Sequence, residues 1–231
     1  MVNVIARSVA PAQVGTANAL GRVSVGVTDS GVVLGRDSAG RPVTARLFGP
    51  RPVSVVFLGG WWAAQVLVHR CLAHGAAVVV EALDPAPPTT TAALAQWLTL
   101  DPGRVRPVAG DAAVAWPASV SQPLLRIVDT PGGAAIPGAP ARLPLQAWHT
   151  QLTMLSSLDL TTVRLLARAD LAIIQRLEPA EAALVGSALL LSPEFVARFG
   201  AMDNEMIAAF QGPATRYVWL TPTAIERQLF G

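Results

Sequence analysis

The chain has 231 residues, of which 52% are hydrophobic and only 14% are charged, and its net charge is +2. This length and apolar fraction suffice for one large domain with a sizeable core, and they exclude an intrinsically disordered chain. All 17 basic residues are arginines, spread from Arg7 to Arg227 without a run. A nucleic-acid-binding surface gathers its cations on one face, so this pattern argues against one. The single cysteine, Cys71, rules out an internal disulfide and a cysteine-based metal site.

No segment of the sequence predicts secretion or membrane insertion. Residues 1–20 lack the basic start and continuous apolar run of a signal peptide. Val53–Val68 is uncharged, but Gly59, Gly60 and Gln65 interrupt it, and it falls short of the ~20 apolar residues that a spanning helix needs. We therefore predict a cytoplasmic protein, and we leave open its peripheral docking, through a complex, at the inner face of the membrane.

The first fifty residues predict a small antiparallel β meander. Asp29-Ser30-Gly31 and Asp37-Ser38-Ala39-Gly40 have the composition of turns and separate runs rich in valine. The strands are expected at Val23–Thr28, Val32–Gly35 and Val43–Phe48.

The next segment is the clearest structural unit of the sequence. Val53–Leu58 is continuously apolar, as expected for a strand buried on both faces. Gly59-Gly60 forms a tight turn, and Trp61–Ala73 has a helical pattern that ends at His74-Gly75. Ala76–Ala82 is a second buried strand, so the unit is a right-handed βαβ crossover between parallel strands.

The rest of the chain alternates predicted helices and strands. In order, we expect a helix at Thr89–Leu100, strands at Arg104–Val108 and Leu124–Asp129, a loop at Pro131–Pro144, helices at Leu145–Ser156 and Leu160–Arg168, a strand at Leu171–Gln175, helices at Pro179–Leu189 and after Ser192, a hairpin of Glu205–Phe210 with Arg216–Leu220, and a final helical turn after Thr221-Pro222. This alternation predicts an α/β fold of three layers, with a mostly parallel sheet, helices on both faces and the antiparallel β meander before it. We assign residues 1–231 to a single α/β domain, with residues 1–50 as the meander and residues 51–231 as a P-loop-like or Rossmann-like core.

The turn after the first buried strand is where an α/β protein usually binds phosphate. A P-loop there needs the pattern G-x-x-x-x-G-K-[ST], whose lysine neutralises phosphate charge and whose hydroxyl holds Mg²⁺. This turn instead reads Gly59-Gly60-Trp61-Trp62-Ala63-Ala64, and the chain contains no lysine. The sequence therefore argues against P-loop nucleotide hydrolysis. We expect the two indoles either to seal the turn or, if exposed, to bind a partner, with Trp148 as a third candidate for partner binding.

A dinucleotide site is the main enzymatic alternative. Gly59 and Gly60 follow a strand, and Glu81 ends the next strand at about the distance where a Rossmann carboxylate binds ribose hydroxyls. The glycine pattern departs from G-x-G-x-x-G, because Trp61 stands where the backbone must approach the pyrophosphate.

Other polar residues give weaker signals. Asp129-Thr130-Pro131-Gly132 follows a buried strand, as does the D-x-x-G of GTPases or a Walker B aspartate. The three histidines are too scattered to predict a metal site, and no nucleophile elbow is present. We predict no catalytic residue, no bound metal and no cofactor.

The segment Val33–Val43 contains G-x-D-x-x-G-x-P-V, which resembles the hairpin before the P-loop strand of FtsK/HerA-type ATPases. Val53–Gly60 then stands in the place of the strand and Walker A turn, and Asp129 in the Walker B position, with Thr130 replacing the usual glutamate. Leu165–Gln175 and the tail of Arg216–Glu226 are similar to the end of such a domain.

The resemblance implies a degenerate P-loop-like pseudoenzyme that serves as a structural or regulatory subunit beside an active motor. Its partner would be a secretion or conjugation ATPase, or further copies of this chain. An actinobacterial type VII secretion system fits the arginine-only composition, which is typical of a GC-rich genome.

Overall fold

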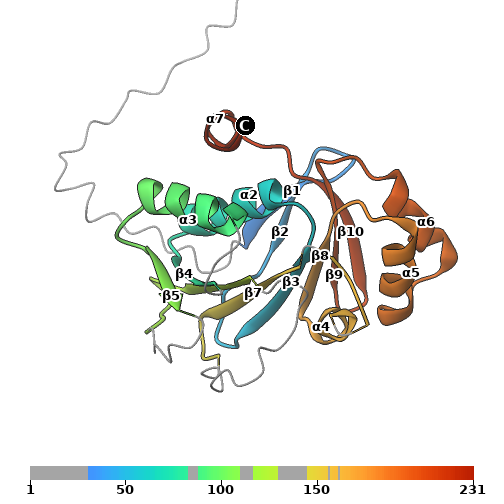
Figure 1. Cartoon of the computed structure of the whole chain (residues 1–231), viewed down its shortest axis with the longest axis horizontal. Coiled ribbons are helices and arrows are strands. Elements are labelled where there is room, and N and C mark those ends of the chain that lie inside the picture. The colour runs from blue at the N-terminus through green and yellow to red at the C-terminus, as the bar shows by residue number, and fades with distance from the viewer. Residues whose placement is uncertain (1–30, 83–87, 110–116, 130–144, 156, 161) are drawn as a thin grey trace, which may run out of the picture.

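The computed structural model describes residues 31–82, 88–109, 117–129, 145–155, 157–160 and 162–231, and one ten-stranded sheet runs through them (Figure 1). The strand order is β2-β1-β10-β9-β8-β3-β7-β6-β4-β5. The strands are β1 (Val32–Arg36), β2 (Pro42–Ala45), β3 (Val53–Leu58), β4 (Ala77–Ala82), β5 (Val105–Ala109), β6 (Leu124–Asp129), β7 (His149–Leu155), β8 (Leu171–Ile174), β9 (Met206–Gln211) and β10 (Ala214–Trp219).

The sheet has a parallel part and an antiparallel part. Strands β8, β3, β7, β6, β4 and β5 pair in parallel, so their carboxyl ends meet at one edge. Strands β9, β10, β1 and β2 extend the sheet with antiparallel pairs. The predicted α/β class with a mostly parallel sheet is confirmed.

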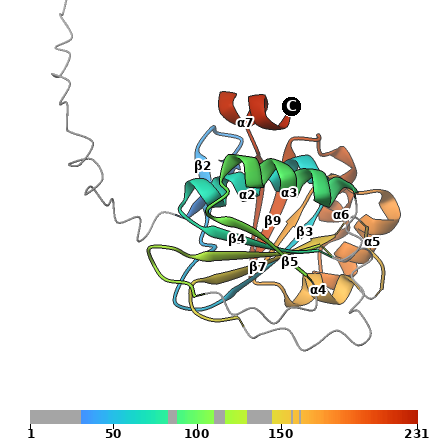
Figure 2. The same cartoon turned by 60° about the vertical axis from the view of Figure 1, so that its left-hand side comes forward.

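Helices cover both faces of this sheet (Figures 1 and 2). On one face, α2 (Trp61–Ala73) and α3 (Pro88–Leu100) pack over a core that includes Val55, Val80 and Ile127. On the other face lie α4 (Val163–Arg168), α5 (Pro179–Ala188) and α6 (Pro193–Ala201). The predicted three-layer arrangement therefore holds.

One predicted helix is wrong. Leu145–Ser156 was expected to be helical, but His149–Leu155 is strand β7, inserted between β3 and β6. A short run with apolar residues on both sides suits a helix and a doubly covered strand equally well, and here pairing with two neighbouring strands decides. The expected strand Val23–Thr28 and the loop Pro131–Pro144 lie outside the described residues.

The hairpin of β1 and β2 belongs to the main sheet, because β1 also pairs with β10. Its turn is organised by Asp37, whose carboxylate accepts hydrogen bonds from the backbone of Ala39 and Arg41 and from the Arg41 side chain. These hydrogen bonds hold the pKa of Asp37 below its ordinary value, and the bonds from the backbone and side chain of Arg41 contribute most. Gly35 permits the close approach to β10, since a Cβ there would lie 2.0 Å from the carbonyl oxygen of Trp219.

Replacing Gly35 with alanine is therefore expected to lower the free energy of unfolding by about 1–3 kcal/mol, because the added methyl group forces β1 and β10 apart. Urea denaturation at neutral pH measures the loss. Gly200→Ala is the matched control: a Cβ at that exposed helical position meets nothing within 4 Å, so stability should hold or rise by up to ~1 kcal/mol. Equal midpoints for Gly35→Ala and the unchanged protein would contradict this account.

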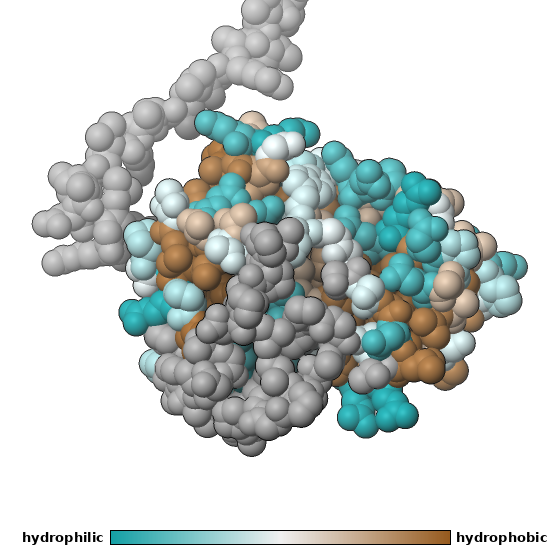
Figure 3. Space-filling view, in the orientation of Figure 1, coloured by the Kyte–Doolittle hydropathy of each residue, from teal (hydrophilic) through white to brown (hydrophobic). Residues whose placement is uncertain are grey.

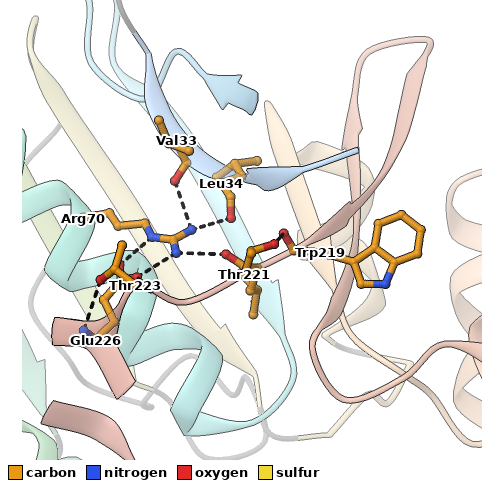
Figure 4. A network of polar contacts seen from close by, with 8 residues as sticks. Val33, Leu34, Arg70, Trp219, Thr221, Thr223 and Glu226 are labelled. Atoms are coloured by element: carbon orange, nitrogen blue, oxygen red, sulfur yellow. Dashed lines mark hydrogen bonds and ion pairs between the residues drawn. The ribbon is translucent and has the colours of Figure 1, made fainter. Parts of the chain in front are cut away.

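The last helix, α7 (Ala224–Phe230), is fixed to α2 and β1 by a buried polar cluster (Figure 4). The guanidinium of Arg70 donates to both carboxylate oxygens of Glu226, at 2.6 and 2.9 Å. It also donates to the carbonyl oxygens of Leu34 and Leu220, at 2.7 and 2.9 Å. Glu226 in turn completes a capping box with Thr223, which explains why the helix begins there.

Hydrophobic and hydrophilic residues are interspersed on the face that Figure 3 shows. Among the described residues, no helix is both long and apolar enough to cross a membrane.

Candidate functional site

The turn between β3 and α2 is the candidate phosphate site, and it is very short. Strand β3 ends at Leu58 and α2 begins at Trp61, so Gly59 and Gly60 alone connect them. Gly60 is the N-cap and supplies no side chain to the end of the helix. A phosphate-binding loop curls several backbone N–H groups around the anion, and two residues are too few to do this.

The side chain of Gln175, which follows β8, fills this turn. Its Oε1 accepts a hydrogen bond from the backbone N–H of Gly60 at 2.7 Å, and its Nε2 donates to the carbonyl oxygen of Asn204 at 2.8 Å. The two partners fix the orientation of the amide, since only the NH₂ group can donate to a carbonyl. Gln175 is 9% exposed. A Cβ at Gly59 would lie 2.5 Å from the same Oε1, so the amide also explains why that position is glycine.

The two tryptophans of the turn lie against the protein rather than away from it. Trp61 and Trp62 are half-buried and pack on the core beneath α2 and α3. The ring of Trp61 lies 6.2 Å from the ring of fully buried Trp97. Trp148 is likewise half-buried against this core. The expected sealing of the turn fits this packing, and partner binding through the exposed parts of the three rings stays a prediction.

Asp129, in the Walker B position, ends strand β6. Strand β7 lies between β6 and β3, so Asp129 stands two strands away from the turn, about 10 Å across the sheet. Its carboxylate accepts a hydrogen bond from the hydroxyl of Thr90, a fully buried residue at the start of α3. In this arrangement Asp129 anchors α3 to the sheet.

Glu81, the ribose-binding candidate, is not a solvent-facing residue. It is 8% exposed and forms an ion pair with Arg126 on the neighbouring strand β6. Glu81 is therefore already paired with a cation, so the proposed contact with ribose hydroxyls would have to compete with this pair.

Gln175 occupies the backbone N–H group of Gly60 in the turn, and it was not identified as a site residue from the sequence. Its contact joins residues 115 positions apart in the sequence, and it depends on β8 lying beside β3, which no local pattern indicates. Arg176 comes next and is exposed.

Within the described part of the chain, no group of three or more histidine, cysteine, aspartate or glutamate residues could hold a metal ion. Cys71 is buried, and burial raises the pKa of its thiol to about 12.

The sequence matches no protein-family profile and no curated protein. The structure, in contrast, is similar to solved structures. VirB4 of Thermoanaerobacter pseudethanolicus aligns with a TM-score of 0.59 and 10% identity, over 87% of this chain and 99% of that one. The genome packaging NTPase B204 of Sulfolobus turreted icosahedral virus 2, in complex with sulfate, aligns with a TM-score of 0.46 and 12% identity, over 74% of this chain and 96% of that one. The likeness to VirB4 extends over most of both chains and shows that the two share an α/β fold.

Proposed function

We propose that this protein is a non-hydrolysing, pseudo-ATPase-like subunit that acts through contacts with other proteins in a secretion or conjugation machine. The observation that carries the proposal is the hydrogen bond of Gln175 to Gly60, because it occupies the N–H group nearest the place where a phosphate would bind. The fold shared with VirB4 supports the link to such machines. A type VII secretion system remains our proposal for the setting.

Three features of the turn support a role without catalysis. A connection of two residues offers few donors, the amide of Gln175 is held at both ends, and the chain has no lysine to balance phosphate charge. Displacing Gln175 would break both of its hydrogen bonds, and a partly buried amide without partners costs about 1–3 kcal/mol. The alternative, a Rossmann-like enzyme that uses Gly59, Gly60 and Glu81, has less support, because Gln175 fills the turn and Arg126 pairs with Glu81.

Thermal unfolding with Mg-ATP, Mg-GTP, NAD or S-adenosylmethionine tests this proposal. A ligand at 100 times its Kd stabilises the fold by about 2.7 kcal/mol, which moves the midpoint by several degrees. We expect no shift with any of the four, and no phosphate release from ATP above a protein-free baseline.

Gln175→Glu is the informative variant. It keeps the size of the side chain and an oxygen for the N–H of Gly60, but it loses the donor to the carbonyl oxygen of Asn204, and its charge repels phosphate. Hydrolysis of ATP by the unchanged protein, lost in Gln175→Glu, would overturn the proposal. Recovery of a secretion or conjugation ATPase with the tagged protein, from cells that express both, is the expected positive result.

A further inference from the structure

A groove of about 430 Å³ lies between α6, strand β10 and the β1–β2 turn. Its lining is apolar and aromatic for the most part and includes Met202, Met206, Tyr217 and Trp219. Arg198 stands on the α6 side, and Asp37 on the side of the hairpin turn. The volume falls within the range of ligand pockets, about 300–1,000 Å³.

The aromatic wall comes from alternate residues of one strand. Tyr217 and Trp219 are two positions apart on β10, so both project from the face of the sheet that α6 covers. Figure 4 shows the indole of Trp219 on the opposite side of its strand from Arg70 and α7. Both rings are half-exposed, and Met202 and Met206 beside them can adapt to different shapes.

Arg198 is held in place at the groove without a carboxylate partner. Its guanidinium carbon lies 5.5 Å from the ring of Phe195 and 5.9 Å from the ring of Tyr217, and these two rings stack with their centroids 6.4 Å apart. Arg198 is exposed, and within the described residues it makes no ion pair. Aromatic faces therefore position a cation whose charge is still available to a ligand.

The carboxylate of Asp37 does not offset this cation. It is already bound by the Arg41 side chain, at 2.8 Å, and by backbone N–H groups of its own turn. The charge that the groove offers a ligand is thus that of Arg198. Tryptophan, tyrosine and arginine are also the residues that dominate binding energy in protein interfaces.

We propose that this groove binds a short segment of a partner protein, which places an apolar side chain against Trp219 and Tyr217 and a carboxylate against Arg198. The choice of a protein as ligand rests on the proposed function. A second copy of this chain fits less well, since a symmetric contact pairs the same surface with itself. Among the described residues that line the groove, Asp37 is the one carboxylate, and it is already paired.

Selection of a random library of 12-residue peptides on the intact protein tests the proposal. Enriched peptides are expected to carry aspartate or glutamate beside a leucine, phenylalanine or tryptophan. Their affinity should fall about tenfold for Arg198→Gln, because a charge-assisted hydrogen bond is lost. Arg216→Gln changes an exposed arginine of strand β10 that does not line the groove; it is the matched control and should leave the affinity unchanged.

Trp219→Leu is the second variant and should weaken binding roughly 30-fold, as at an interface hot spot; circular dichroism establishes that it is folded. No enrichment, peptides without a carboxylate, or equal binding to Arg198→Gln would each overturn the proposal. So would self-association in sedimentation equilibrium that Arg198→Gln abolishes, because the groove would then join two copies. The nucleotide experiments are independent of this selection, so either idea can fail alone.

Discussion

Replacing Arg70 with alanine is expected to lower the free energy of unfolding by about 3–5 kcal/mol, since it leaves the buried carboxylate of Glu226 without its cation. Glu226 is 3% exposed, and Arg70 binds both of its oxygens. The change also leaves the carbonyl oxygens of Leu34 and Leu220 without this donor. Urea denaturation followed by circular dichroism measures the effect.

Two further variants separate charge from geometry. Arg70→Lys keeps the charge but cannot reach the carboxylate and both carbonyls with one planar group, so an intermediate loss is expected. Arg227→Ala removes an exposed arginine from the same helix, α7, and should change stability by no more than about 0.5 kcal/mol. If Arg70→Ala were as stable as Arg227→Ala, α7 would not be fixed by this cluster.

Acid should weaken the same cluster. Burial is the largest influence on the pKa of Glu226 and raises it, but the hydrogen bonds from Arg70 and Thr223 outweigh burial and leave the pKa below its ordinary value. A carboxylate with a lowered pKa in the folded state contributes stability that is complete above its unfolded pKa, about 4.3, and lost as pH falls through the folded value. The stability difference between the unchanged protein and Glu226→Gln should therefore be largest at neutral pH and shrink in acid.

Much of the fold could be predicted because its strands and helices carry strong local signals. The apolar run of β3, the glycine turn and the helix α2 were found at their observed bounds, and so was the hairpin of β9 and β10 to within a few residues. Strand β7 was missed because its sequence does not distinguish a doubly covered strand from a helix. Its identity comes from its neighbours in the sheet, which are distant in sequence.

The position of the β3–α2 turn could be predicted from the sequence, but the side chains that occupy the polar groups of the candidate site could not. The turn at Gly59 and Gly60 was identified from the sequence alone, whereas Gln175 and Arg126, which occupy the candidate binding groups, were not. Both contacts require the strand order: β8 beside β3, and β6 beside β4. In contrast, the capping box at the start of α7 is a local signal, T-x-x-E at Thr223 and Glu226, and it could have been recognised.

Removing Arg126 is expected to cost about 3–5 kcal/mol, because Glu81 would keep a buried charge without its cation. The two residues lie on adjacent strands in diagonal positions, with Arg126 opposite Val79 and Glu81 opposite Val128. Arg126→Met tests this in urea. The double variant Glu81→Leu with Arg126→Met should recover most of the loss, because paired apolar residues can replace a buried ion pair with little cost.

Variants of Glu81 also decide between the two roles considered for this residue, an ion-pair partner of Arg126 and a ligand of ribose hydroxyls. If Glu81 serves the fold, Glu81→Leu alone should lower the free energy of unfolding, and adding Arg126→Met should restore it. NAD should then shift the unfolding midpoint of neither the unchanged protein nor the variants. If Glu81 binds ribose hydroxyls, NAD should stabilise the unchanged protein, and Glu81→Gln should remove that stabilisation. The same change should lower the unfolding midpoint of the unliganded protein, because it also breaks the ion pair with Arg126. Arg126 binds Oε1 of Glu81, so a ribose hydroxyl would have to bind this carboxylate beside the guanidinium, and the response to NAD decides whether it does.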